Sequence, residues 1–305
     1  MKPSSPLPVP LFLPLLAGMA AISFAPILVR LSDAPVSVQG MYRMLFTIAI
    51  MLPLGTGRLP SARAIAGKDW LLLGAAGFFL ALHFLLWMSS LNYTSIASST
   101  IILSLQPVFV MLGALIAFKD KPNRFALLGM AVGLTGAIIV GTGDKGASHA
   151  ALSGDILSFL SVIAIAFNLL IAKRILTRVS TYLYNMIVFS ICLLFFTVYN
   201  WIMNIPMTGY AGKEWFVFLL LAVVPTMLGH MVFNWLLKYV QPTTISMAVF
   251  AEPVGASLLG MLIFSEMVTG FQLIGGAFVI AGLIVYLRSE RLAAGRGKRR
   301  TTSLK

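Results

Sequence analysis

The stretch EPVGASLLGMLIFSEMVTGFQLIGGAFVIAGLIVY, residues 252–286, has a counterpart earlier in the chain. A shift of 146 residues places it without a gap on QPVFVMLGALIAFKDKPNRFALLGMAVGLTGAIIV, residues 106–140, and ten of the 35 positions are identical. The identities include Pro107/Pro253, Val108/Val254, Phe118/Phe264, Phe125/Phe271, Gly129/Gly275 and Gly136/Gly282, and Tyr93 and Tyr239 also coincide. Apolar segments can match by chance, but shared Pro, Phe and Gly in one register predict a duplication.

The composition excludes a soluble globular protein. Of the 305 residues 59% are hydrophobic and 10% are charged, with a mean hydropathy of +0.95, whereas soluble domains carry about 25% charged residues. The apolar residues form blocks long enough to cross a hydrocarbon core of about 30 Å. We place ten blocks near 10–31, 36–54, 69–90, 96–118, 122–141, 153–176, 180–203, 213–237, 243–265 and 268–288. The sequence therefore predicts an all-α membrane protein of ten transmembrane helices.

The N-terminal sequence MKPSSPLPVPLFLPLLAGMAA is weakly similar to a signal peptide. Because nine further apolar blocks follow it, we interpret it as the first span. Cys192 is the one cysteine of the chain, which excludes an intrachain disulfide and predicts no metal site built on cysteines. It lies in an apolar run, where we expect it to serve packing.

The duplication predicts two domains of similar fold, at residues 1–145 and 146–290, followed by a basic tail at 291–305. Each domain contains five helices. An odd number of crossings makes the second domain enter the membrane in the opposite sense to the first. Such inverted repeats are typical of secondary transporters, whose binding site lies near the bilayer midplane between the halves.

The charges of one matched link agree with inversion. The link after the fourth span carries Lys119, Lys121 and Arg124, whereas its counterpart SEMVTG carries only Glu266. Because cytoplasmic links are enriched in Lys and Arg, the two links are expected on opposite sides of the membrane.

The net charge of +13 raises the question of a nucleic-acid partner. With the tail RSERLAAGRGKRRTTSLK in the cytoplasm and an even number of spans, the predicted cytoplasmic segments hold 18 of the 22 Lys and Arg residues. These are Lys2, Arg58, Arg63, Lys68, Lys119, Lys121, Arg124, Lys173, Arg174, Arg178, Lys238 and the seven from Arg288 onward. The opposite side holds Arg30, Lys145 and Lys213, and Arg43 lies within a span. This bias predicts a multi-pass membrane protein with both termini cytoplasmic. The tail is expected to contact anionic lipid and no nucleic acid.

Gln106 and Glu252 occupy matched positions near the middle of the fourth and ninth spans. Nine residues of the ninth span precede Glu252, about 13–15 Å of helix, so its carboxylate cannot reach the membrane surface. It must face the bundle interior or a water-filled cavity. Pro107 and Pro253 follow, and each is expected to break its helix. The pattern predicts a central polar pocket; the alternative is a structural kink with a buried, hydrogen-bonded Glu.

Arg43 lies about two turns into the second span. Its side chain can extend outward to the membrane surface or neutralise a buried acid. If it is internal, it is a candidate for an ion pair with Glu252 or for contact with an anionic ligand.

The third and eighth spans, FFLALHFLLWMSSLNY and PTMLGHMVFNWLLKY, each place a His four or five residues before a Trp. The pairs His83/Trp87 and His230/Trp235 therefore lie near one helix face. Recurrence in both halves favours a cavity for a small amphipathic or partly aromatic solute; the alternative is ordinary core packing. We take these four residues with Gln106 and Glu252 as candidate substrate-binding residues, and add Asn168 and Asn234 as further polar candidates.

Glycines at 129–133 and at Gly275, Gly276 and Gly282 permit close approach of helices. This serves packing within the monomer or, as the alternative, a homodimer that the fold does not require.

Several of these features together resemble the EamA family of the drug/metabolite transporter superfamily. They are the two PV motifs, the charged turns after AF and IF, the Gly-rich fifth and tenth spans, and MYRMLF in the second span. The resemblance covers nearly the whole chain. It implies a ten-helix basket with a central cavity, usually an exporter of amino acids, drugs, pigment precursors or other metabolites. Family members often carry a Trp in the first span, where this chain has Phe24 and Pro26.

The predicted function is a secondary transporter that exports a small metabolite by alternating access, without a cofactor. Glu252 or a His can carry a coupled proton, and uncoupled exchange fits the sequence equally well. The rival classes are a membrane enzyme and a channel. The chain contains no His-Glu-x-x-His or Gly-x-Ser-x-Gly motif. It has one midplane acid where aspartyl chemistry needs two, and no selectivity-filter motif.

Overall fold

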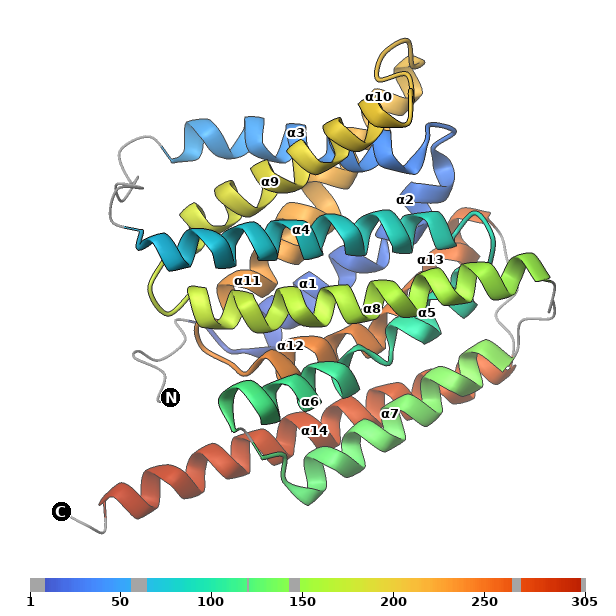
Figure 1. The fold of residues 1–305 in the computed structure, drawn as a ribbon. Helices are drawn as coiled ribbons and strands as arrows, with labels where there is room; N and C mark the ends of the chain where they lie inside the picture. The colour runs from blue at the N-terminus through green and yellow to red at the C-terminus, as the bar shows by residue number, and fades with distance from the viewer. Residues whose placement is uncertain (1–8, 56–64, 120, 143–148, 265–269, 303–305) are drawn as a thin grey trace.

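The computed structural model describes residues 9–55, 65–119, 121–142, 149–264 and 270–302, and every regular element in these ranges is helical. The first repeat comprises α1 (Phe12–Ser23), α2 (Ala25–Leu31), α3 (Val36–Leu54), α4 (Gly67–Ser90), α5 (Ile96–Leu103), α6 (Gln106–Phe118) and α7 (Arg124–Thr142). The second comprises α8 (His149–Ile175), α9 (Thr181–Ile202), α10 (Gly212–Leu221), the π-helix η2 (Ala222–Met231), α11 (Val232–Leu236), α12 (Pro242–Ala248), the 3-10 helix η3 (Val249–Ala251), α13 (Glu252–Phe264) and α14 (Gly270–Thr302). The helices run roughly alongside one another as a bundle (Figure 1).

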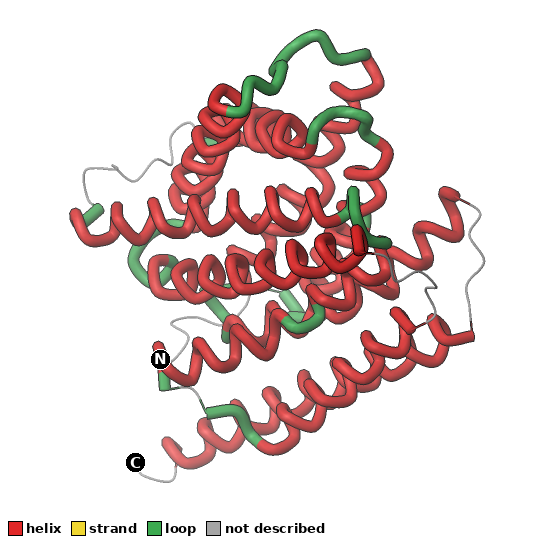
Figure 2. The backbone as a smooth tube through the Cα atoms, turned by 45° about the vertical axis from the view of Figure 1, so that its right-hand side comes forward, coloured by secondary structure: helices red, strands yellow, loops and turns green. Residues whose placement is uncertain are grey.

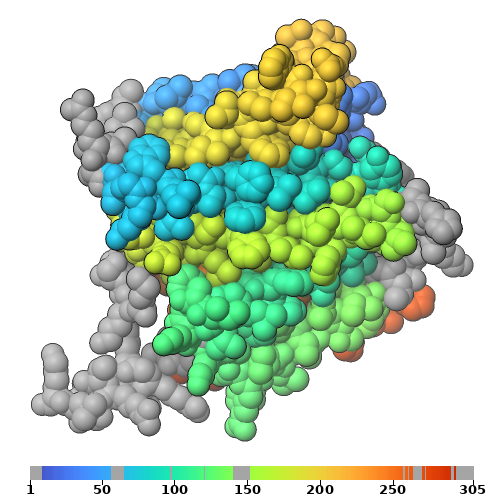
Figure 3. All heavy atoms as spheres, viewed as in Figure 1, coloured from blue at the N-terminus to red at the C-terminus, as the bar shows by residue number. Residues whose placement is uncertain are grey.

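Eight helical stretches of the described chain are long and apolar enough to cross a membrane. Two shorter apolar helices, Arg124–Ile139 within α7 and Leu273–Ser289 within α14, accompany them. Together they occupy the places of the ten predicted blocks. Large apolar side chains are exposed on the outer helices, as contact with lipid requires; Ile116 is 82% exposed and Leu71 77%. On the face shown in Figure 3, α4, α8, α6 and α7 lie in successive layers.

The ends of the predicted domains differ from the helix limits. α14 continues without a break to Thr302, so most of the basic tail predicted at 291–305 extends the last helix. The predicted boundary between residues 145 and 146 lies outside the described residues, as do Lys2, Arg58, Arg63, Lys145, Glu266 and Lys305.

Both repeats interrupt their fourth span at the same register. In the first repeat α5 ends at Leu103 and α6 begins at Gln106; in the second η3 separates α12 from α13, which begins at Glu252. Each new helix therefore has its proline, Pro107 or Pro253, at the second position, where the missing N–H costs no helical hydrogen bond.

The inversion is visible where α7 crosses α14. These two helices lie side by side and antiparallel at the edge of the bundle (Figures 1 and 2). A Cβ atom on Gly129 would lie 2.7 Å from the carbonyl oxygen of Gly282, and one on Gly136 would lie 2.6 Å from that of Gly275. Gly275 and Gly282 are the repeat counterparts of Gly129 and Gly136. The first glycine of each repeat therefore meets the second glycine of the other repeat. A two-fold axis in the membrane plane requires this arrangement.

A second pair of contacts obeys the same relation. Arg30, at the end of the first span, donates to the carbonyl oxygens of Leu91 (3.3 Å) and Thr94 (2.8 Å) at the end of the third. In the second repeat Lys173 donates to the carbonyl oxygens of Leu237 (2.7 Å) and Val240 (2.8 Å). Leu237 and Val240 are the repeat counterparts of Leu91 and Thr94. A cation thus caps the C-terminal end of the third span in each repeat, at opposite ends of the molecule.

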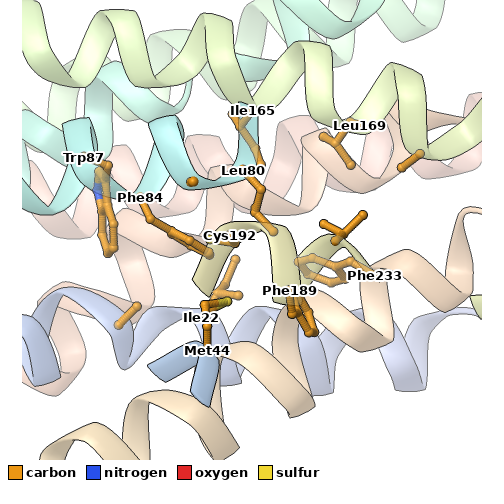
Figure 4. Close-up of a cluster of buried hydrophobic side chains, with 14 of the residues drawn as sticks. Ile22, Met44, Leu80, Phe84, Trp87, Ile165, Leu169, Phe189, Cys192 and Phe233 are labelled. Carbon is orange, nitrogen blue, oxygen red and sulfur yellow. The ribbon is translucent and has the colours of Figure 1, made fainter. Parts of the chain in front are cut away.

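The core is formed by side chains of both repeats. Figure 4 shows Leu80 and Phe84 of α4 pointing into the interior, toward Cys192 of α9 and Ile22 of α1. Cys192 is fully buried there, as its apolar surroundings in the sequence predicted.

The glycine crossing makes a prediction about stability. A Cβ on Gly282 would press on the backbone nitrogen of Gly133 and lie 2.6 Å from the carbonyl oxygen of Gly129. Gly282→Ala is therefore expected to cost about 1–3 kcal/mol through overpacking and to lower the melting temperature of the purified protein. Gly74→Ala in α4 is the control, because its Cβ would meet nothing within 4 Å. Equal melting temperatures for the two variants would contradict the close crossing.

Candidate functional site

A cavity of about 60 Å³ lies between the two repeats. Eighteen residues line it, nine from each repeat. Ten of these form five pairs separated by 146 residues: Ile22/Asn168, Phe84/His230, Trp87/Phe233, Leu103/Val249 and Gln106/Glu252. The cavity therefore lies at the axis that relates the repeats.

Most of the candidate residues come together in this lining. It includes His83, Trp87, Gln106, Arg43, His230 and Glu252, together with Asn168 and Asn234. Pro107 and Pro253 are buried beside Gln106 and Glu252 without lining the cavity.

Trp235 is the candidate that the structure places elsewhere. Its ring packs edge-on against Tyr239, with centroids 5.3 Å apart, and it is absent from the cavity lining. The two His/Trp sequences are not in repeat register: the counterpart of His230 is Phe84, and that of Trp87 is Phe233. The two His/Trp pairs therefore do not occupy equivalent positions in the two repeats.

His83 is held in one orientation. Its Nδ1 lies 3.1 Å from the carbonyl oxygen of Ser161, and its ring is nearly parallel to that of Trp87 at 6.3 Å between centroids. A carbonyl only accepts, so Nδ1 carries the hydrogen and Nε2 of the neutral ring is left as an acceptor.

Arg43 is internal. Its side chain has no exposed surface, and the guanidinium carbon lies 4.1 Å from the centre of the Phe84 ring. The His230 ring lies nearly perpendicular to the same phenyl ring, with ring centroids 5.1 Å apart. Packing of a cation on an aromatic face is favourable where both are desolvated. Arg43 interacts electrostatically with Glu252, and the described ion pairs within 4 Å do not include this pair.

The guanidinium is oriented by the π-helix η2. Pro225 has no N–H for the carbonyl oxygen of Leu221, four residues earlier. In a π-helix the backbone donor lies five residues on instead, here at Thr226. The hydroxyl of Thr226 also donates to the Leu221 oxygen (2.8 Å), and the Thr226 oxygen accepts from Nε of Arg43 (2.5 Å). π-Helices occur frequently at functional sites. The sequence analysis missed Thr226; the indicator available was a proline in mid-span followed by a hydroxyl residue.

The two asparagines of the lining are anchored through their amide groups. Asn168 donates to the carbonyl oxygen of Ala76 in α4 (2.9 Å), and Asn234 donates to the side-chain oxygen of Asn185 in α9 (2.7 Å). Each therefore ties a lining helix to its neighbour while contributing polarity to the cavity.

An acidic residue in the first turn of each third span contacts the other repeat. Asp69 forms an ion pair with Arg178 in the α8–α9 link (2.9 Å). Glu214 accepts from the hydroxyl of Ser32 and from the backbone N–H of Asp33 (3.2 Å) in the α2–α3 link. We call these contacts the Asp69 clasp and the Glu214 clasp. Ser32 and Arg178 are again 146 residues apart, and the two clasps lie at opposite ends of the bundle.

The EamA-like transporter family matches residues 10–142 and 152–288. The chain belongs to this family. Each matched segment covers one five-helix repeat, and the resemblance drawn from the PV motifs and the Gly-rich spans is confirmed. The protein is accordingly a multi-pass membrane transporter.

Individual relatives that are named transporters support the same conclusion. An uncharacterized transporter of Archaeoglobus fulgidus is 28% identical over 251 residues, which cover 81% of this chain and 84% of the relative. One of Clostridium kluyveri is 23% identical over 266 residues, covering 83% and 84% of the two chains. The uncharacterized transporter YyaM of Bacillus subtilis is 24% identical over 228 residues, covering 71% and 72%. A crystal structure, 17% identical, superposes with a TM-score of 0.76 over 92% of this chain and 97% of the other, so the two share the fold.

The placement of the two tryptophans predicts different effects on ligand binding. Trp87→Phe, which copies the counterpart Phe233, is expected to reduce by at least half the thermal stabilisation given by a bound solute, since the indole lines the cavity. Trp235→Phe is the matched control and is expected to leave that stabilisation unchanged. Melting curves of purified protein with amino acids, nucleosides, sugars and cationic drugs test this. A loss confined to Trp235→Phe would place the binding site outside this cavity.

Proposed function

We propose that this EamA-like protein is a secondary transporter that moves a small metabolite by alternating access. The observation that carries the proposal is the polar cavity on the axis between two inverted repeats, with nine lining residues from each. Sites for small molecules are usually about 300–1,000 Å³, several times the volume of this cavity. Binding therefore requires the repeats to move apart, and movement at one end at a time gives alternating access.

The lining supports an amino-acid-like or an amphipathic, aromatic solute. His83, Phe84 and Trp87 provide aromatic surface along α4, whereas Arg43 and Glu252 provide charged groups from the two repeats. Gln106 and His230 complete the proposed binding set. No cofactor is needed for this mechanism, and the proposed partners are the solute and membrane lipid. Neither nucleic acid nor a second copy of the chain is required.

We further propose export across a bacterial inner membrane, with both termini cytoplasmic; the charge distribution supports this orientation. Among the described links and helix ends other than the C-terminal part of α14, one end of the bundle carries eight cations, and the other carries Arg30 and Lys213. The eight are Lys68, Lys119, Lys121, Arg124, Lys173, Arg174, Arg178 and Lys238. The cation-rich end is therefore assigned to the cytoplasm.

The two clasps are suited to act as the alternating gates. Each joins the two repeats, and the Asp69 clasp lies at the proposed cytoplasmic end while the Glu214 clasp lies at the external end. The two carboxyl-bearing residues are buried, at 5% and 4% exposure, whereas the Arg178 side chain of the Asp69 clasp is 40% exposed. Separation of the repeats at one end breaks one clasp and leaves the other in place.

Neutralising the clasps is expected to shift the transporter in opposite directions. Asp69→Asn should favour opening to the cytoplasm, and Glu214→Gln should favour opening to the outside. Each shift should be about fivefold if the clasp contributes about 1 kcal/mol. The measurement is the rate at which a membrane-impermeant thiol reagent, added from either side, labels Leu103→Cys in the cavity lining, with Cys192 replaced by Ala.

Asp33→Asn is the control, because that carboxylate is 87% exposed and pairs only with the exposed Lys213 among the described ion pairs. It is expected to change labelling little, since exposed pairs contribute about 0–1 kcal/mol. Parallel transport assays in proteoliposomes should show reduced solute counterflow for both clasp variants. Labelling shifts in the same direction for both clasp variants would contradict alternating gates.

A further inference from the structure

The guanidinium group of Arg43 has hydrogen-bonding capacity that the described residues do not use. Its Nε donates to Thr226, whereas Nη1 and Nη2 are buried and have no hydrogen-bond partner. The side chain has no exposed surface and lines the central cavity. An arginine side chain stays charged in proteins, and a buried charge without a partner is strongly unfavourable.

The free edge of this group has a defined chemical preference. Nη1 and Nη2 present a planar fork of N–H donors that matches the two oxygens of a carboxylate. Phe84 covers one face of the guanidinium at 4.1 Å, which leaves the in-plane donors as the route to a ligand. A lysine ammonium at this place would supply charge without the fork.

The orientation of the fork depends on Thr226. Its hydroxyl is fixed by donating to the carbonyl oxygen of Leu221, at the start of the π-helix η2. The Thr226 oxygen therefore presents its acceptor side to Nε of Arg43. The groups that hold and aim the guanidinium thus come from the two different repeats.

The arrangement exists on one side of the repeat axis. The residue 146 positions after Arg43 is Phe189, and the residue 146 positions before Thr226 is Leu80. Both counterparts are apolar and lack hydrogen-bonding groups in their side chains. A solute that contacts the fork is therefore bound in a single orientation. A site with the same residues in both repeats would bind it in two symmetry-related orientations.

We infer that Arg43 binds a carboxylate group of the transported solute through Nη1 and Nη2, and that Thr226 is the residue that positions it. This inference rests on the proposed function and narrows its substrate class to carboxylate-bearing solutes. Glu252 is the acidic residue of the described cavity lining, and it competes for the guanidinium.

The test compares carboxylates with their amides. Melting curves of the purified full-length protein are recorded with phenylalanine, leucine and benzoate, and with phenylalaninamide, leucinamide and benzamide. At least one carboxylate is expected to bind at least about 30-fold more tightly than its amide, because loss of a partner from a buried charged hydrogen bond is costly. Binding of amides with equal affinity, or stabilisation by none of the three carboxylates, overturns the inference.

Variants separate positioning from general stability. Arg43→Lys and Thr226→Val are expected to reduce the carboxylate-to-amide affinity ratio at least about tenfold, whereas Thr226→Ser keeps the hydroxyl and the ratio. Thr47→Val is the matched control: it removes another buried hydroxyl from α3, one that donates to the Arg43 carbonyl oxygen and leaves the guanidinium untouched. An unchanged ratio in Thr226→Val removes Thr226 from the mechanism.

Two further outcomes distinguish this inference from the proposed function. If wild-type protein transports an amine or a neutral solute and Arg43→Lys transports it equally well, the carboxylate site is wrong and the transporter stands. If Glu252→Gln restores the melting temperature lost in Arg43→Met, and no carboxylate preference exists, Arg43 serves an internal ion pair and the inference fails.

Discussion

Within hydrocarbon every backbone N–H and C=O group must find its hydrogen-bond partner inside the protein. The structure of this EamA-like transporter depends on how that constraint is met where its helices are interrupted. Pro107 and Pro253 stand at the second position of a new helix, where no N–H is needed. At Pro225 the chain forms a π-helix, whose bonds reach five residues on, and the hydroxyl of Thr226 also donates to the carbonyl oxygen of Leu221. Each solution places a polar group beside the central cavity, so the interruptions and the candidate site arise together.

The duplication determines how the helices pack, whereas differences between the two copies determine which polar groups line the cavity. The glycines at the crossing of α7 and α14, the carbonyl oxygens bound by the cationic caps, and the clasp residues all recur at a spacing at or within one residue of 146. Around the cavity the matched positions differ in charge or polarity: Gln106 corresponds to Glu252, and Phe84 corresponds to His230. The same backbone symmetry that favours alternating access therefore encloses an asymmetric set of side chains. Such asymmetry is what recognition of a polar solute needs.

Much of this arrangement follows from the sequence. Apolar block length and the matched Pro, Phe and Gly positions were sufficient for the all-α fold and the inversion, because membrane thickness and backbone hydrogen bonding leave few alternatives. The lining could be predicted to include Glu252, Gln106 and His83, because polar groups at mid-span must face the bundle interior or a water-filled cavity. Arg43 was undecided, since two turns from a membrane surface its long side chain reaches either environment and only packing against Phe84 decides.

The errors have equally physical causes. Trp235 was paired with Trp87 from similar spacing to a His, but spacing within a span does not fix repeat register. Thr226 was overlooked because a hydroxyl in a span ordinarily bonds its own helix, and the loss of a donor at Pro225 becomes informative only with Arg43 beside it.

The central claim is that the repeats are inverted, and the matched residues Tyr93 and Tyr239 test it most directly. Both lie in short links, after α4 and after α11 respectively. Tyr93→Cys and Tyr239→Cys, each with Cys192 replaced by Ala, are labelled in cells with a membrane-impermeant maleimide, before and after permeabilisation. Inverted repeats predict that Tyr93→Cys reacts in intact cells and Tyr239→Cys only after permeabilisation. Reaction of both from the same side would show parallel repeats and contradict the account.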